Sequence, residues 1–280
     1  MLVYIFPLLA MLSFGLSPLF YKYVINLNVN PITANQVRVI MTFFIMMVIF
    51  VPEFFIIWRI SAFDLLIFAL ISFFGIFLGD TFYFYSLKYT DVSITAPLSS
   101  TYAIMIAIIM FAFFNVGITA FEIIGGIVIV IGIWIIQERT RKMVQKIGIF
   151  LALLSALFYS IAIILMDMIL PKTSVYSLVI FRIIFSIIFL LPISIPKGNF
   201  PRSPKVWALL GIGGFFGIGI GIVFMLYSMD YLGVVTTGLF SSASPMITSF
   251  LGILLFKERK NFLKILGISL ILAGLIIISY

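Results

Sequence analysis

Apolar runs long enough to cross a bilayer follow one another along nearly the whole chain, separated by short polar breaks. As an α-helix, a run of about 20 apolar residues spans the hydrocarbon core of a membrane. Hydrophobic residues make up 64% of the 280 residues and charged residues 9%, so a soluble protein of this size could not bury its apolar surface. The pattern predicts an all-α integral membrane protein, without the alternating strands of a barrel. The ten predicted transmembrane helices are Leu2–Ile25, Ile32–Val51, Phe63–Ser86, Ser93–Phe114, Thr119–Ile136, Ile147–Ile169, Val175–Ile195, Val206–Ser228, Val234–Phe256 and Asn261–Ser279.

The chain also contains an internal duplication. Gly79–Ile136 aligns without a gap with Gly221–Ile278, at an offset of 142 positions, and 16 of the 58 paired positions are identical. Chance would give about a tenth in so Ile-rich a composition. We therefore interpret the chain as one unit, duplicated and fused. The matched polar positions of this stretch include Ser86 with Ser228, Thr95 with Thr237, and Ser99 with Ser241. Outside it, the same offset matches Ser13 with Ser155.

The two copies are predicted to lie in the membrane with opposite orientations. Each copy carries five predicted helices, and an odd number of spans starts the second copy on the other side of the bilayer. We expect ten transmembrane helices arranged as two inverted five-helix repeats. The first repeat covers residues 1–138, a basic connecting loop covers 139–146, and the second repeat covers 147–280. Inverted repeats around a site near the bilayer midplane are typical of secondary transporters, and a duplicated scaffold without a pathway is the alternative.

The residue types that the chain lacks exclude several kinds of chemistry. It has no cysteine and no histidine, which excludes disulfides, thiol catalysis, and thiolate or imidazole metal sites. It has no phosphate-binding loop and no carboxylate pair at catalytic spacing. We expect no enzyme activity, no metal and no cofactor. The net charge of +8 comes from basic residues beside the predicted helices, where lipid headgroups rather than nucleic acid are the expected partners.

Two charged residues of the first repeat are predicted to lie deep in the membrane. Arg38 is six residues inside the second helix, and Asp80 is six residues before the end of the third. The second helix begins at the surface where the third ends, so both side chains should lie roughly 9–10 Å below that surface. A charge at such depth is costly, and we expect the two residues to pair or to share a polar network. Alternatively, Arg38 extends alone toward the surface and Asp80 caps a nearby backbone break.

The second repeat keeps the arginine but not the carboxylate. Arg182 aligns with Arg38 when the repeat offset is increased by two residues. The position that aligns with Asp80 at the unchanged offset is Ile222. An unpaired arginine that faces a cavity could bind an anionic group such as a carboxylate. In the alternative, Arg182 has a structural role and contacts Tyr227 or backbone carbonyls.

Hydroxyl and aromatic side chains recur at matching positions in both repeats. Ser13 and Ser17 share one face of the first helix. Ser155 and Tyr159 do the same on the sixth. Such stripes either hold helices together or line a wet cavity. The candidate substrate-binding residues are Ser13, Ser17, Arg38, Asp80, Tyr83, Ser99, Tyr102, Ser155, Tyr159, Arg182, Tyr227, Ser241 and Ser244, and helix kinks are expected at Pro18, Pro97 and Pro245.

The end of the second repeat resembles a known family. Pro245 is followed by Gly252–Arg259, which reads Gly-Ile-Leu-Leu-Phe-Lys-Glu-Arg, and then by Gly267 and Ala273-Gly274. This pattern is similar to the closing helix pair of the drug/metabolite transporter (DMT) superfamily, specifically of its ten-helix EamA-type exporters. The duplication extends the resemblance over nearly the whole chain, and it implies efflux or exchange of small metabolites, often amino acids. The chain departs from the family pattern at Phe14, where members often carry Trp, and at Asn115-Val116, which replaces the Lys-Glu pair of the second repeat.

We therefore expect a secondary transporter that moves small metabolites, amino acids or similar compounds, by alternating access, with export as the implied direction. Within transport, the alternatives are a multidrug exporter and a nucleotide-sugar or sugar-phosphate exchanger, which would need a cluster of cationic residues in its cavity. From other classes, the alternatives are a channel and a structural membrane protein. The expected partners are the lipid bilayer, the small-molecule substrate and, through Asp80, protons. The expected assembly is a monomer or weak homo-oligomer.

The basic residues predict an orientation in the plasma membrane. Thirteen Lys and Arg residues lie in or beside the connections that follow odd-numbered helices, whereas the opposite face has only Arg59 and Lys172. By the positive-inside rule, the face with the thirteen is cytoplasmic and both termini are external. The family resemblance implies the opposite, with cytoplasmic termini.

Overall fold

The protein is helical throughout the part that the computed structural model describes, which is residues 2–50, 61–90, 92–136, 143–196, 200–255 and 262–278. No strand occurs within these ranges, which confirms the all-α prediction for them. The elements in chain order are η1 (Leu2–Tyr4), α1 (Ile5–Asn26), α2 (Pro31–Ile49), α3 (Ala62–Ser72), η3 (Phe73–Asp80), α4 (Thr81–Tyr89), α5 (Val92–Ser99), α6 (Tyr102–Phe114), α7 (Ala120–Ile136), α8 (Met143–Ile169), η4 (Leu170–Lys172), α9 (Val175–Ser194), α10 (Pro204–Gly214), η5 (Phe215–Ile220), α11 (Gly221–Ser242), α12 (Pro245–Leu255) and α13 (Phe262–Ile278).

Within the described ranges, 7 helical stretches are long and apolar enough to cross a membrane. The helices α7 and α13 are also apolar, but their apolar segments, Ala120–Ile135 and Ser269–Ile278, are shorter than the other 7. The longest stretch, Pro204–Thr248, covers 45 residues that the sequence divides into an eighth and a ninth helix. Gly233 lies inside it with a φ of 76° and a ψ of 166°, a backbone that residues with a Cβ rarely adopt, and this interrupts the helix. Ten separate spans and their inverted arrangement stay predictions.

The order of elements repeats at the offset that the sequence shows. The succession α3, η3, α4 begins at residue 62, and the succession α10, η5, α11 begins at residue 204. The two π-helical segments start at matching positions, where Phe73–Ile76 and Phe215–Ile218 both read Phe-Phe-Gly-Ile. A π turn shifts the backbone out of the α-helical hydrogen-bond pattern. Carbonyl groups in both segments accept side-chain donors, and these contacts help to build the site.

Two helices that the sequence predicts as single spans with a proline kink are broken into separate helices. The helix expected over residues 93–114 is divided into α5 and α6, and that expected over 234–256 is divided between the end of α11 and α12. Pro97 lies two residues before the end of α5, and Pro245 is the first residue of α12. A proline lacks the backbone donor and crowds the preceding turn, which favours a helix end there. By contrast, α1 continues through Pro18.

The helix α8 begins earlier than the sequence predicts. The predicted connecting loop covers residues 139–146, but α8 starts at Met143, so the last four of these residues are helical. Met, Gln and Lys all favour helix, and the first glycine after them is Gly148. Residues 139–142 lie outside the described ranges.

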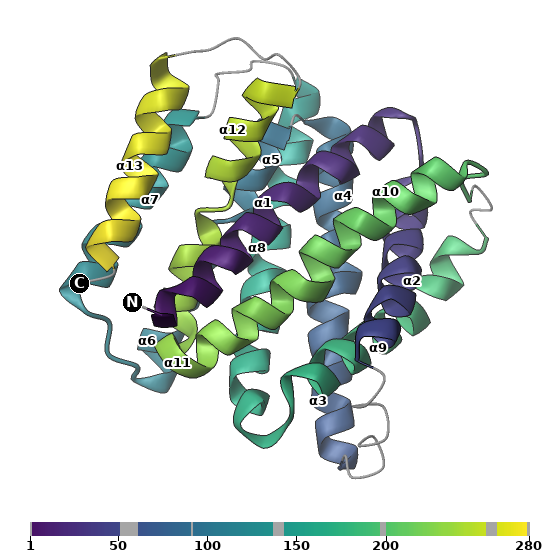
Figure 1. Ribbon diagram of the computed structural model, residues 1–280, viewed down its shortest axis with the longest axis horizontal. Coiled ribbons are helices and arrows are strands. Elements are labelled where there is room, and N and C mark those ends of the chain that lie inside the picture. Colours follow the sequence, from purple (N-terminus) through teal and green to yellow (C-terminus); the bar gives the residue numbers. More distant parts are fainter. Residues whose placement is uncertain are drawn as a thin grey trace.

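Glycines bring two helices of different halves into close contact. The helices α7 and α13 lie side by side at one end of the molecule (Figure 1). A Cβ added at Gly132 would lie 2.7 Å from the carbonyl oxygen of Gly267, and one added at Gly274 would lie 2.7 Å from that of Gly125. Such backbone contacts are how small residues hold transmembrane helices together. Away from this pair, α1 packs against α10, α11 and α12, and η5 packs against α1, which places the middle of α1 beside the cavity described next.

Candidate functional site

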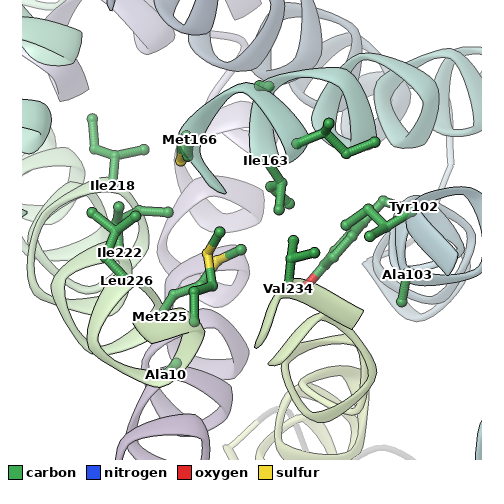
Figure 2. Close-up of a cluster of buried hydrophobic side chains, with 14 of the residues drawn as sticks. Ala10, Tyr102, Ala103, Ile163, Met166, Ile218, Ile222, Met225, Leu226 and Val234 are labelled. Atoms are coloured by element: carbon green, nitrogen blue, oxygen red, sulfur yellow. The ribbon is translucent and has the colours of Figure 1, made fainter. Parts of the chain in front are cut away.

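A cavity of about 140 Å³ lies among helices from both halves of the chain. Its lining comes from α1, α2, η3 and α4 to α6 of the first half, and from α8, α9, η5 and α11 of the second. An apolar cavity of about 150 Å³ in another protein binds benzene, so this one has room for roughly six to eight non-hydrogen atoms. Figure 2 shows part of its apolar wall, where Ile163 and Met166 on α8 lie across from Ile218, Ile222 and Met225 on η5 and α11.

The cavity brings together most of the residues that the sequence singled out, although which of them touch a substrate stays a prediction. Three candidates, Ser13, Ser155 and Ser241, are buried but do not line it. The hydroxyl of Tyr227 donates to the hydroxyl of Tyr176 at 2.8 Å, and Tyr227 does not line the cavity either. The candidates that line it are Ser17, Arg38, Asp80, Tyr83, Ser99, Tyr102, Tyr159, Arg182 and Ser244, together with Pro18.

An ion pair forms the centre of the polar wall. Arg38 Nη2 lies 2.5 Å from Asp80 Oδ2 and donates to Asn35 Oδ1 at 2.6 Å. The other carboxylate oxygen of Asp80 accepts a hydrogen bond from the Tyr159 hydroxyl at 2.6 Å. The side chains of Arg38 and Asp80 are 2% and 8% exposed, so each charge depends on its partners to offset desolvation. The pairing is the one expected from the depth of the two residues in their helices.

Aromatic rings and an amide hold Arg38 in place. The ring centroids of Tyr21 on α1 and Phe84 on α4 both lie 5.1 Å from the guanidinium carbon, within cation–π distance. Asn35 also donates to the carbonyl oxygen of Ile76 in η3 at 3.1 Å. Sequence reasoning missed Tyr21 and Asn35. Both carry a signal, because Tyr21 extends the hydroxyl stripe of α1 and Asn35 lies three residues before Arg38 on the same face of α2.

Arg182 on α9 has a different partner from Arg38. Its Nη2 donates to the carbonyl oxygen of Ile218 in η5 at 2.9 Å. Ile218 matches Ile76 at the repeat offset, so Arg182 makes in the second half the carbonyl contact that Asn35 makes in the first. Among the described residues, no carboxylate forms an ion pair with Arg182. Its Nε is buried without a hydrogen-bond partner.

A second set of hydroxyl groups holds helices together away from the cavity. Ser86 Oγ lies 2.9 Å from Thr95 Oγ1 and donates to the carbonyl oxygen of Gly148 at 2.8 Å. Ser228 and Thr237 repeat the first of these contacts at 2.8 Å. None of these residues lines the cavity, so helix contact accounts for these matched polar positions of the two repeats.

Comparisons with known proteins find relatives over nearly the whole chain. The sequence model of the EamA-like transporter family matches residues 1–137 and 146–280. A protein of Archaeoglobus fulgidus that is described as an uncharacterized transporter is 28% identical over 220 residues, which is 78% of this chain and 76% of the relative. One crystal structure of a protein matches with a TM-score of 0.77 and 13% identity, over 99% of this chain and 94% of the other, which shows a shared fold.

Proposed function

This chain belongs to the EamA-like transporter family, and we propose that it is a secondary transporter that moves small metabolites across the plasma membrane by alternating access. The proposed cargo is an amino acid or a similar compound, and the proposed direction is export. One observation carries the proposal: residues of both halves line a common cavity that contains the buried pair Arg38–Asp80 and the arginine Arg182. Ionisable groups at membrane depth are costly, and membrane proteins retain them mainly along substrate or ion pathways.

We also propose that ten spans form two inverted five-helix repeats. The two stretches that the family model matches fall on the predicted halves of the chain. The succession of an α-helix, a π segment and an α-helix recurs at the repeat offset, and both halves contain a broken helix near the cavity. Broken helices beside a central site are typical of transporters in which one repeat rocks against the other.

Asp80 is the residue that we propose for coupling to protons. It is the one carboxylate that lines the cavity in the described part of the chain. A proton on Asp80 would remove its charge and leave Arg38 without an ionised partner among the described residues. Coupling predicts that a pH gradient accelerates flux, and that Asp80→Asn abolishes this acceleration.

Counterflow in proteoliposomes tests the proposed function. Vesicles containing the purified protein are loaded with an unlabelled branched-chain amino acid or hydroxy acid, and uptake of the labelled compound from outside is followed. A carrier gives saturable uptake that the internal compound stimulates, because loaded carriers return faster than empty ones. A channel gives flux that the internal compound does not stimulate, and that result, or the absence of flux, would overturn the proposal.

Two features of the cavity favour small metabolites over nucleotide sugars and sugar phosphates as substrates. A nucleotide-sugar or sugar-phosphate exchanger needs several free cations, but the described lining contains two arginines, and Asp80 neutralises one of them. The cavity volume of about 140 Å³ is also small for a nucleotide. We therefore retain small metabolites as the proposed class.

The orientation that we propose follows the charge count, with both termini external. Many of the basic residues behind this count lie outside the described ranges, so the proposal rests on their positions in the sequence. A reporter fused to the C-terminus tests it in the membrane.

A further inference from the structure

The cavity contains one positive charge more than it contains negative charges. Its lining includes Arg38, Arg182 and Asp80, and no other Asp, Glu, Lys or Arg of the described ranges. With all three ionised, one guanidinium is not balanced by a carboxylate. In a low-dielectric, largely apolar setting, such a charge attracts an anion much more strongly than it would in water.

The unbalanced charge belongs to Arg182. Both carboxylate oxygens of Asp80 are occupied, one by Arg38 and the other by Tyr159. The position of α11 that matches Asp80 is Ile222, which lines the cavity but offers no charge. A guanidinium has five N–H donors, and the carbonyl oxygen of Ile218 occupies one of them. The Nε atoms of Arg182 and Arg38 are both buried without a hydrogen-bond partner among the described residues, but only Arg38 has a carboxylate beside it, so Arg182 retains both an unused donor and an unbalanced charge.

A carboxylate matches this donor set. Its two oxygens accept parallel hydrogen bonds from a guanidinium, which is the strongest geometry that arginine forms with small anions. An ammonium group has no comparable partner among the described lining residues, because Asp80 is already engaged and the remaining polar side chains there are hydroxyls. The rest of the wall is apolar, as Ile163, Met166 and Met225 illustrate (Figure 2).

We infer that the cavity binds a small aliphatic monocarboxylate, held by Arg182, and prefers this monoanion to the amino-acid zwitterion of the same shape. The inference rests on the proposed transport function and narrows its substrate class to net anions of roughly six to eight non-hydrogen atoms. Hydroxy acids with a short branched chain satisfy the charge, the size and the apolar wall together.

A matched ligand series tests the inference directly. Valine and 2-hydroxy-3-methylbutanoate have the same carbon skeleton, and the amide of the hydroxy acid removes the charge. Equilibrium binding of each to the purified full-length protein in detergent micelles is measured at pH 7. We expect the hydroxy acid to bind at least about tenfold more tightly than the hydroxy amide, because a hydrogen bond to a charged group is worth that factor or more. We expect a similar margin over valine, because its ammonium group would lose its hydration without gaining a carboxylate partner. Equal or tighter binding of valine, or no binding of any of them, would overturn the inference.

A substitution at Ile222 tests whether the unbalanced positive charge of the cavity attracts the ligand. Ile222→Asp supplies the carboxylate that the first half already has in Asp80, and it should occupy Arg182 in place of the ligand. Ile222→Asn has nearly the same shape without the charge. We expect the affinity for the hydroxy acid to be at least about tenfold lower in Ile222→Asp than in Ile222→Asn. The same affinity in both would show that Arg182 does not hold the anion.

Variants of Arg182 separate ligand contact from a structural role. Arg182→Gln should lose the preference for the hydroxy acid over valine, whereas Arg182→Lys should keep part of it because the charge remains. A folded Arg182→Gln protein with the preference intact would assign Arg182 to helix bracing and refute ligand contact. If this variant does not fold, the Ile222 pair and the ligand series decide.

Counterflow distinguishes failure of the inference from failure of the transport function. Counterflow of valine without counterflow of the hydroxy acid would overturn the inference and leave a transporter. Binding of the hydroxy acid that Ile222→Asp weakens, without counterflow of either compound, would support the inference and refute transport.

Discussion

Replacing Asp80 and Arg38 together should destabilise the protein by less than the sum of the losses from the two single replacements. In Asp80→Asn, the guanidinium of Arg38 stays buried, with 2% of its side chain exposed, and retains the amide of Asn35 and the faces of Tyr21 and Phe84. An unpaired buried charge of this kind costs about 3–5 kcal/mol. In Arg38→Met, the carboxylate of Asp80 is left with Tyr159 as its partner and should cost a similar amount.

The double variant tests the pairing quantitatively. In Arg38→Met/Asp80→Asn both charges are absent. The free energy of unfolding should therefore fall by about 2–3 kcal/mol less than the sum of the decreases in the two single variants. The assay is the free energy of unfolding of all four proteins in mixed detergent micelles, combined as a double-mutant cycle. Thr248→Val with Asp80→Asn is a control cycle, because Thr248 donates to the carbonyl of Gly15 and does not line the cavity. If the Arg38 and Asp80 losses add to within about 0.5 kcal/mol, as we expect for the control, the reasoning is refuted.

Three further predictions follow, two from single contacts and one from the distribution of basic residues. Tyr159→Phe removes a hydrogen bond to the Asp80 carboxylate and should lower the unfolding free energy by about 1.5–3 kcal/mol. Tyr176→Phe removes a neutral contact to Tyr227 and should lose less, and the reverse order of the two losses would contradict this. Gly132→Ala places a Cβ 2.7 Å from the Gly267 carbonyl oxygen and should lower the melting temperature, at a cost of about 1–3 kcal/mol. Gly117→Ala meets nothing within 4 Å and is its control, so equal losses would argue against close contact of α7 and α13. A reporter at the C-terminus that is active only outside the cell should be active, and activity of a cytoplasmic reporter instead would reverse the proposed orientation.

The helices and the buried pair could be predicted because both depend on counting along a helix. A rise of 1.5 Å per residue converts the positions of Arg38 and Asp80 into depths below one surface. The structure places their side chains in contact, which agrees with that count. The arginine of the second half could be identified from the internal duplication, because the alignment of the two repeats places Arg182 opposite Arg38.

Which single side chains line the cavity could not be predicted from the sequence. Successive residues of a helix are turned by about 100°, so an error of one residue in the rotation of a helix moves a side chain from a cavity to a helix contact. Depth along the helix and side-chain length matter as well, since Ser155 and Tyr159 share one face of α8 but only the longer side chain, Tyr159, lines the cavity. On the broken helix of the second half, Ser244 lines the cavity and Ser241 does not.

The π segments were not predicted, and the helix breaks were predicted only as proline kinks, for a different reason. Pro97 marks a weak point, but the break falls three and four residues later, where Ser100 and Thr101 lie between α5 and α6. The π segments have no sequence rule of their own. Their one visible sign is the repeated Phe-Phe-Gly-Ile, which indicates a conserved place in the repeat but not a wider turn.

The two halves use the same backbone feature with different side chains, and this difference determines the charge of the cavity. In the first half, Asn35 takes the π-segment carbonyl, which leaves Arg38 to pair with Asp80. In the second half, the residue that matches Asn35 is Val179, so Arg182 takes the carbonyl itself. An anion bound to the free Nε of Arg182 would thus be linked through one side chain to the backbone of η5. Because the anion and the Ile218 carbonyl would use donors of the same guanidinium, ligand binding would alter the contact between α9 and η5, which gives the proposed transporter a direct physical connection between its cargo and its helices.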